Sequence, residues 1–119
     1  MKRVLIVDDD AAIRSLLRMT LPDDAYEVAE AADGSEVPAL LDQGVPDLVV
    51  LDWKMPGKHG AFVLDELKAR YPALPVVVLT AEGRDTQRAL AEALHADAYL
   101  TKPFSPLELL DTIERLLAA

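Results

Sequence analysis

The sequence contains no cysteine, and this absence excludes several kinds of chemistry. Disulfide bonds, zinc–thiolate sites and thiol catalysis all need cysteine, so none of them is available to this chain. Long hydrophobic runs are also missing. The apolar stretch after Lys2 and Arg3 is too short for a signal peptide, and no later run is long enough to cross a bilayer. We therefore expect a cytoplasmic protein.

Basic residues are scarce, with 12 Lys and Arg against 21 Asp and Glu and a formal net charge of −9. This surplus argues against direct binding to nucleic acid or to an anionic membrane, because both are polyanions. It is compatible with a cation site, although most of the acids are expected simply to be solvated on helix surfaces. The length of 119 residues, 51% of them hydrophobic, suits a single compact domain over residues 1–119.

Short apolar runs alternate with helical patterns along the chain. Runs rich in β-branched residues are typical of strands buried on both faces. The clear runs span residues 4–7, 48–51 and 76–79, and weaker strands are expected at 26–31 and 99–100. Strands separated by helices pair in parallel through right-handed crossovers. The pattern predicts an α/β fold, a doubly wound five-stranded parallel sheet with helices on both faces.

Three helix starts can be predicted from capping residues. Asp10 is expected to begin or cap the first helix, where an acid interacts favourably with the helix dipole. Proline is tolerated only in the first turn, so the second helix should begin late, with Ser35 as N-cap and Pro38 at its third position. In the last helix, Ser105 and Glu108 have the spacing of a capping box.

Polar residues lie at or just beyond the carboxyl ends of the expected strands, where open parallel sheets bind ligands. They are Asp8, Asp9, Asp52, Thr80 and Lys102. Carboxylates gathered there repel strongly, and a bound divalent cation removes that penalty. Oxygen ligands suit Mg²⁺ or Mn²⁺ rather than zinc. Such a cation with a lysine and a threonine nearby favours a phosphoryl group, and a carboxylate can be the nucleophile that forms an aspartyl phosphate.

Four motifs occur in order along the chain: "VDDD" at 7–10, "LDWKMPGKHG" at 51–60, "LTA" at 79–81 and "YLTKPF" at 99–104. Together they resemble the receiver domain of two-component response regulators over essentially the whole chain. The resemblance implies a flavodoxin-like (βα)5 fold and a phosphoacceptor switch rather than an enzyme. It also implies a histidine kinase or phosphotransfer protein as the phosphoryl donor.

The resemblance implies a role for each matching residue. Asp52 would accept the phosphoryl group. Asp8 and Asp9 would hold Mg²⁺ together with Asp52 and the backbone carbonyl of Lys54, and Lys102 would pair with a phosphoryl oxygen.

The resemblance also implies a switch. Thr80 would donate its hydroxyl on activation, with the Ala81 amide beside it, and Tyr99 would then turn inward. This rearrangement would alter the face formed by the fourth helix, the last strand and the last helix. Gly57 and Gly60 would shape the loop after the acceptor.

Further expectations concern single positions. The Lys102–Pro103 bond is expected to be cis, as in the family. His95 stands where receivers often carry a left-handed glycine, and neither it nor His59 is expected to bind a metal. Trp53 is expected to be an aromatic residue of a loop or rim. Lys54 and Glu82 carry opposite charges that could pair across the mouth of the site.

Three other functions remain open. A phosphatase-like hydrolase of the haloacid-dehalogenase-like group needs an acid two residues after its nucleophile, where this chain has Lys54. A flavodoxin-like cofactor binder needs a Gly- or hydroxyl-rich phosphate loop after the first strand, where three aspartates would repel the phosphate. A degenerate receiver would signal without phosphorylation, and the complete set of site residues argues against it.

The expected partners include a downstream target protein or an output domain missing from this sequence. Arg88 and Glu108 match one ion pair of the dimer face found in the DNA-binding branch of the family. Ala98 and Thr112 replace the acid and the arginine that usually complete that network. We therefore expect a monomer or a weak dimer.

Overall fold

The computed structural model describes residues 1–55, 59–81 and 85–118. Strands and helices alternate along the chain. The strands are β1 (Lys2–Val7), β2 (Tyr26–Ala31), β3 (Leu48–Asp52), β4 (Val76–Thr80) and β5 (Ala98–Thr101). The helices are α1 (Ala11–Thr20), the short 3-10 helix η1 (Gly34–Glu36), α2 (Val37–Gln43), α3 (Gly60–Arg70), α4 (Asp85–Ala93) and α5 (Pro106–Ala118). Within the described residues, no helix has both the length and the hydropathy needed to cross a membrane.

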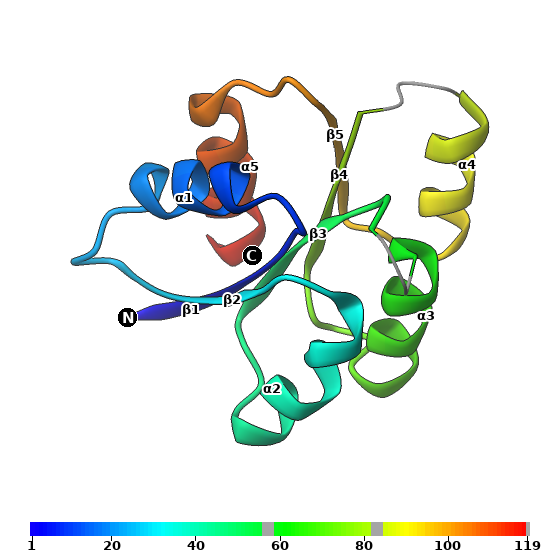
Figure 1. Cartoon of the computed structure of the whole chain (residues 1–119), viewed down its shortest axis with the longest axis horizontal. Coiled ribbons are helices and arrows are strands. Elements are labelled where there is room, and N and C mark those ends of the chain that lie inside the picture. The colour runs from blue at the N-terminus through cyan, green and yellow to red at the C-terminus, as the bar shows by residue number, and fades with distance from the viewer. Residues whose placement is uncertain (56–58, 82–84, 119) are drawn as a thin grey trace.

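The five strands form one parallel sheet in the order β2-β1-β3-β4-β5 (Figure 1). This arrangement confirms the predicted doubly wound α/β fold. The strand order changes direction at β1, because β2 lies on one side of it and β3, β4 and β5 follow on the other. In such sheets the chain leaves β1 and β3 toward opposite faces, which opens a crevice at their carboxyl ends.

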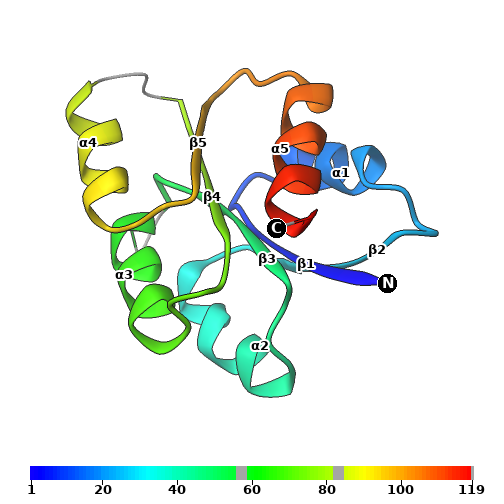
Figure 2. The ribbon, with the colours of Figure 1, turned by 180° about the vertical axis from the view of Figure 1, so that it is seen from behind.

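Helices cover both faces of the sheet, as Figure 2 shows from behind. Alternate strand residues point to opposite faces. Leu5 and Val7 of β1 pack with residues of α2, α3 and α4, whereas Val4 and Ile6 pack with Leu17 of α1 and with residues of α5. Burial on both faces explains why the central strands are continuous apolar runs in the sequence.

The register of the strands aligns their carboxyl ends. Val7 pairs with Leu51, so the next residue along each strand, Asp8 in one case and Asp52 in the other, lies at the same level of the sheet. Thr80 pairs with Thr101 at the ends of β4 and β5. The parallel register therefore brings polar residues that are far apart in sequence to one edge.

The second helix begins differently from the prediction. Asp33, and not Ser35, is the capping residue: its carboxylate accepts a hydrogen bond from the Ser35 amide at 2.9 Å, and Glu36 accepts one from the Asp33 amide at 2.8 Å. This capping box starts η1, and the α-helix follows from Val37. The 3-10 turn delays the α-helix, so Pro38 still falls within the first turn of α2, but at its second position and not at the predicted third.

Other predicted local features are confirmed. Asp10 caps α1, since its carboxylate accepts a hydrogen bond from the Ala12 amide at 2.9 Å. Ser105 accepts one from the Glu108 amide at 3.4 Å at the start of α5. His95 has a left-handed backbone with φ 71°, and the Lys102–Pro103 bond is cis.

Gly60 begins α3 in close contact with the end of β3. Its amide donates to the Trp53 carbonyl at 2.9 Å. A Cβ at this position would lie 2.6 Å from the Asp52 carbonyl oxygen and 2.8 Å from the Trp53 Cα. Both neighbours are backbone atoms that cannot rotate away, so only glycine fits here without a shift of the main chain. Gly57, the other glycine predicted to shape this loop, lies outside the described residues.

We expect Gly60→Ala to destabilise the protein. The added methyl group forces the backbone of β3 and α3 apart, and overpacking of this kind costs about 1–3 kcal/mol. Urea denaturation followed by circular dichroism measures the change. An unchanged or higher midpoint would contradict the close contact, because alanine is otherwise the better helix former.

Candidate functional site

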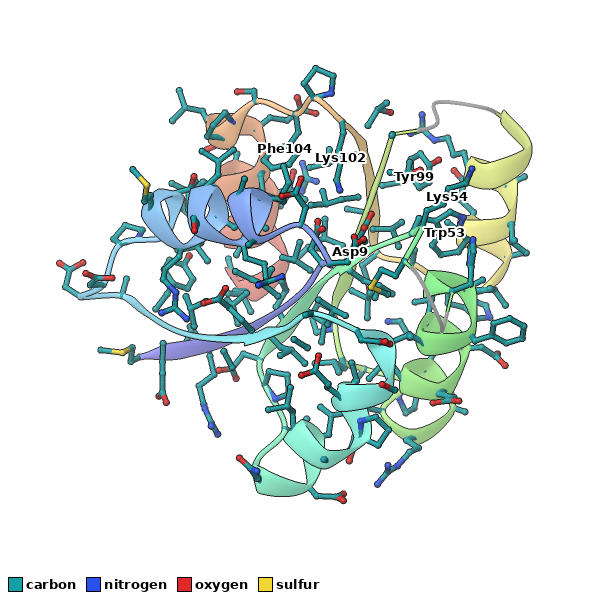
Figure 3. All side chains as sticks on the ribbon, in the orientation of Figure 1. Asp9, Trp53, Lys54, Tyr99, Lys102 and Phe104 are labelled. Atoms are coloured by element: carbon teal, nitrogen blue, oxygen red, sulfur yellow. The ribbon has the colours of Figure 1, made fainter. Side chains whose placement is uncertain are left out.

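Four predicted site residues meet at the carboxyl edge of the sheet. Asp8 follows β1, Asp52 ends β3, and Lys102 follows β5. Figure 3 shows Asp9 and Lys102 at this same end of the sheet. The structure therefore brings together side chains from three strands, as the sequence predicted.

Lys102 joins two of the carboxylates directly. Its Nζ donates to Asp8 Oδ2 at 3.1 Å and to Asp52 Oδ1 at 3.2 Å. Asp8 and Asp52 are only 1% and 5% exposed, so this ion pair is shielded from water. The Asp10 amide donates to the second oxygen of Asp8 at 2.9 Å, and the Lys102 amide donates to the Thr80 carbonyl. The ammonium is thus fixed by backbone and side-chain contacts together.

Asp8, Asp9 and Asp52 form an acidic cluster. Each offers a carboxylate oxygen, and these oxygens lie within 4.8 Å of one another. Asp8 and Asp52 are buried, whereas Asp9 is exposed. An oxygen-only donor set with three carboxylates fits a hard divalent cation. The cluster also carries more negative charge than the single ammonium of Lys102 offsets.

The electrostatics of Asp52 reflect this imbalance. Burial raises the pKa of Asp52 to about 7, the charge of Asp8 adds to the rise, and Lys102 opposes it. The pKa of Lys102 is also raised: burial alone would lower it, but the two carboxylates that it contacts outweigh that effect. The lysine therefore stays charged, while burial and the charge of Asp8 disfavour the anionic form of Asp52 when no cation is present.

The other predicted residues surround this cluster. Thr80 is buried at the end of β4, and Ala81 follows it at the surface. Tyr99 is half-buried in β5 and packs against the core below α4, with the Arg88 guanidinium 5.8 Å from its ring centre. Lys54 is exposed two residues after Asp52. Glu82, its predicted partner, lies outside the described residues.

The expectation for Trp53 was right about its backbone, which lies in the loop after β3, and wrong about a place at the rim. Its side chain is fully buried in the core and not at a rim, and its ring meets that of His59 edge-on at 5.3 Å. His59 caps α3, since its Nδ1 accepts a hydrogen bond from the Ala61 amide at 3.0 Å. The Gly60 amide donates to the Trp53 carbonyl, so the start of α3 is tied to the residue that follows β3. This cap by His59 was not predicted, because histidine is not among the residues that commonly cap helices.

A further contact was not expected from the sequence. Arg14 of α1 donates from Nη1 to the backbone carbonyl of Asp8 at 2.7 Å. The helical spacing of α1 placed Arg14 on the polar side of the helix, but no local pattern indicates that its side chain reaches the end of β1.

Comparisons with known proteins agree with this geometry. Residues 4–114 match the family model described as the response regulator receiver domain. The chain is 43% identical over 117 residues to the transcriptional regulatory protein CpxR of Klebsiella pneumoniae subsp. pneumoniae (strain HS11286), covering 98% of this chain and 50% of that protein. It is 36% identical over 118 residues to the phosphate regulon transcriptional regulatory protein PhoB of Escherichia coli (strain K12), covering 98% and 52%.

The chain spans about half the length of these two relatives. Among solved structures, the chemotaxis protein CheY4 of Vibrio cholerae superposes with a TM-score of 0.90 at 35% identity, covering 98% of both chains. The family match, the relatives and the shared fold lead to one conclusion: this chain belongs to the receiver domain family of two-component response regulators, in which the domain serves as a phosphoacceptor switch.

Proposed function

We propose that Asp52 is the phosphoacceptor of this receiver and that Asp8 and Asp9 hold Mg²⁺, or Mn²⁺, beside it. The observation that carries the proposal is the contact of Lys102 with both Asp8 and Asp52, next to a cluster of three carboxylates. Asp52 is the only member of the cluster that ends the central strand β3. The backbone carbonyl of Lys54 is the further ligand implied by the family resemblance.

The chemistry follows from the positions of these groups. A carboxylate oxygen of Asp52 forms a bond to phosphorus while the phosphorus–nitrogen bond of a phosphohistidine donor breaks, and the electron pair returns to the donor's imidazole. A bound divalent cation would neutralise the phosphoryl oxygens and favour the anionic form of Asp52. Lys102, already at hydrogen-bond distance from Asp52, pairs with a phosphoryl oxygen.

The response to phosphorylation is assigned to Thr80 and Tyr99. Thr80 ends the strand next to Asp52, and its hydroxyl would donate to a phosphoryl oxygen, beside the amide of Ala81. Tyr99 lies on the neighbouring strand under Arg88 of α4, so its rotation would change the surface formed by α4, β5 and α5. The activity is a signalling switch with self-catalysed phosphotransfer and autodephosphorylation, and not turnover of a separate substrate.

Partners follow from the same assignment. A histidine kinase or phosphotransfer protein would supply the phosphoryl group. A downstream target or a separate output domain would read the changed surface, because the relatives of this chain are about twice its length. We assign residues 1–119 to one receiver domain, a monomer or weak dimer without direct contact to nucleic acid or membrane. The cytoplasmic location stays a prediction.

The hydrolase and cofactor-binding alternatives belong to other families, and the degenerate receiver is distinguished by phosphorylation itself. Wild-type protein incubated with Mg²⁺ and acetyl phosphate should gain one phosphoryl group in intact mass. Asp52→Asn should gain none, because the nucleophilic oxygen is replaced by an amide. Asp42→Asn, which changes an exposed acid of α2, serves as control and should be modified like wild type. Equal modification of Asp52→Asn would refute the assignment.

Mg²⁺ should stabilise the folded protein in a saturable way. A cation that binds only the folded state adds about 2.7 kcal/mol at one hundred times its dissociation constant. NaCl at equal ionic strength should not reproduce the rise in melting temperature. Asp9→Asn should leave the metal-free melting temperature unchanged or raise it, because repulsion falls, and it should weaken the response to Mg²⁺. Coincident Mg²⁺ and NaCl curves for wild type would exclude the metal site.

The raised pKa of Asp52 predicts a specific pH dependence in metal-free protein. The folded state binds one more proton than the unfolded state between about pH 4 and pH 7, so stability falls as pH rises through this range. Compared with Asp52→Asn in EDTA, wild type should lose on the order of 2 kcal/mol of unfolding free energy between pH 5 and pH 8. Parallel curves for the two proteins would show that Asp52 titrates normally.

A further inference from the structure

Arg14 connects the edge strand β2 to the end of β1. Its Nε donates to Glu30 Oε1 at 3.0 Å, and its Nη1 donates to the Asp8 carbonyl oxygen at 2.7 Å. The Arg14 side chain is only 19% exposed, so the guanidinium lies in a confined position between the two strands. One planar group thus bonds simultaneously to an anion on β2 and to the backbone beside the acidic cluster.

Glu30, which accepts the hydrogen bond from Arg14, is also held by a second arginine. Arg18, one turn further along α1, donates from Nε and Nη2 to Glu30 Oε2 at 2.9 and 2.7 Å. It also donates to the Val28 carbonyl at 3.2 Å. Hydrogen bonding from Arg18, and to a lesser degree from Arg14, lowers the pKa of Glu30. Glu30 is therefore ionised and binds both arginines, Arg14 through Oε1 and Arg18 through Oε2. Of the two arginines, only Arg14 also donates to the Asp8 carbonyl.

The orientation of the Asp8 carbonyl affects the orientation of the Asp9 backbone and side chain. The Asp8 carbonyl and the Asp9 amide belong to one planar peptide group, so fixing one fixes the other. The Asp8 side chain is held independently by the Asp10 amide and by Lys102. Asp9 is exposed, and the direction of its side chain depends on that peptide plane. Arg14, which is bound to Glu30 of β2, donates a hydrogen bond to the oxygen of this peptide group.

We propose that Arg14 is a positioning residue for the cation site: through the Asp8 carbonyl it holds the Asp9 carboxylate toward Asp52. This inference rests on the proposed Mg²⁺ site and extends it to a residue that does not touch the ion. Two physical effects of removing Arg14 have opposite signs. Loss of a nearby positive charge would strengthen binding of a cation, whereas loss of orientation weakens it. The direction of the change therefore separates them.

The test compares Arg14→Met with Arg18→Met. Both variants keep an unbranched apolar stem on α1 and remove one guanidinium bound to Glu30, but only the first removes the contact with Asp8. Mg²⁺ is titrated at constant ionic strength, and binding is followed by the fluorescence of Trp53, the only tryptophan of the chain. We expect the Mg²⁺ dissociation constant to rise about tenfold in Arg14→Met, the effect typical of a lost supporting contact, and to stay within about twofold in Arg18→Met.

An unchanged or lower dissociation constant in Arg14→Met would overturn the proposal. If that variant does not fold, Arg14→Lys takes its place. It keeps the charge, but a single ammonium cannot span Glu30 and the Asp8 carbonyl as the guanidinium does, so weaker binding supports the proposal and wild-type binding overturns it. The ¹⁵N order parameter of the Asp9 amide in metal-free protein should also fall in Arg14→Met and not in Arg18→Met.

The experiment distinguishes a failure of the proposed Mg²⁺ site from a failure of the positioning role of Arg14. If wild type gives no saturable response to Mg²⁺, the cation site itself is wrong, and the role of Arg14 falls with it. If wild type binds Mg²⁺ and Arg14→Met binds it equally well, the site stands and only the positioning role is wrong.

Discussion

Three carboxylates lie so close together at one edge of the sheet that their mutual repulsion must be balanced by the remainder of the fold. Asp8, Asp9 and Asp52 place their oxygens within 4.8 Å of one another, and two of these side chains are almost completely buried. Lys102 offsets only part of that charge. A fold that keeps such a cluster must supply the missing stability elsewhere, and here the buried central strands and their helical layers do so.

The surroundings of the cluster are rigid for reasons that can be named. The backbone contact of Gly60 ties the start of α3 to the end of β3, and Trp53 fills the core directly after Asp52. On the other side, Arg14 and Glu30 tie α1 and β2 to the Asp8 backbone. The acids are thus held close together by neighbours on both faces of the sheet, so the acidic cluster proposed to bind a cation is already assembled.

Local sequence patterns predicted the elements well where one physical signal dominated. The apolar runs predicted the central strands, and Asp10 and Ser105 predicted their helix starts. The second helix shows where such reasoning fails. Pro38 correctly indicated a late α-helix, but Asp33 and not Ser35 is the capping residue, because a 3-10 turn separates the cap from the α-helix. Asp33 and Ser35 are two residues apart and both residue types cap helices well, so the sequence alone does not decide between them.

Residue type and spacing along the chain were enough to predict the alternation of strands and helices, the exclusion of thiol chemistry and the acids at the strand ends. The motifs extended this to the family and to the cis Lys102–Pro103 bond. Only the tertiary structure decided that Trp53 is buried and that Arg14 reaches the Asp8 carbonyl. The burial of Trp53 depends on which surfaces meet in the core. The Arg14 contact depends on how α1 packs beside the end of β1, although Arg14 and Asp8 are only six residues apart. Neither arrangement leaves a periodic trace in the sequence.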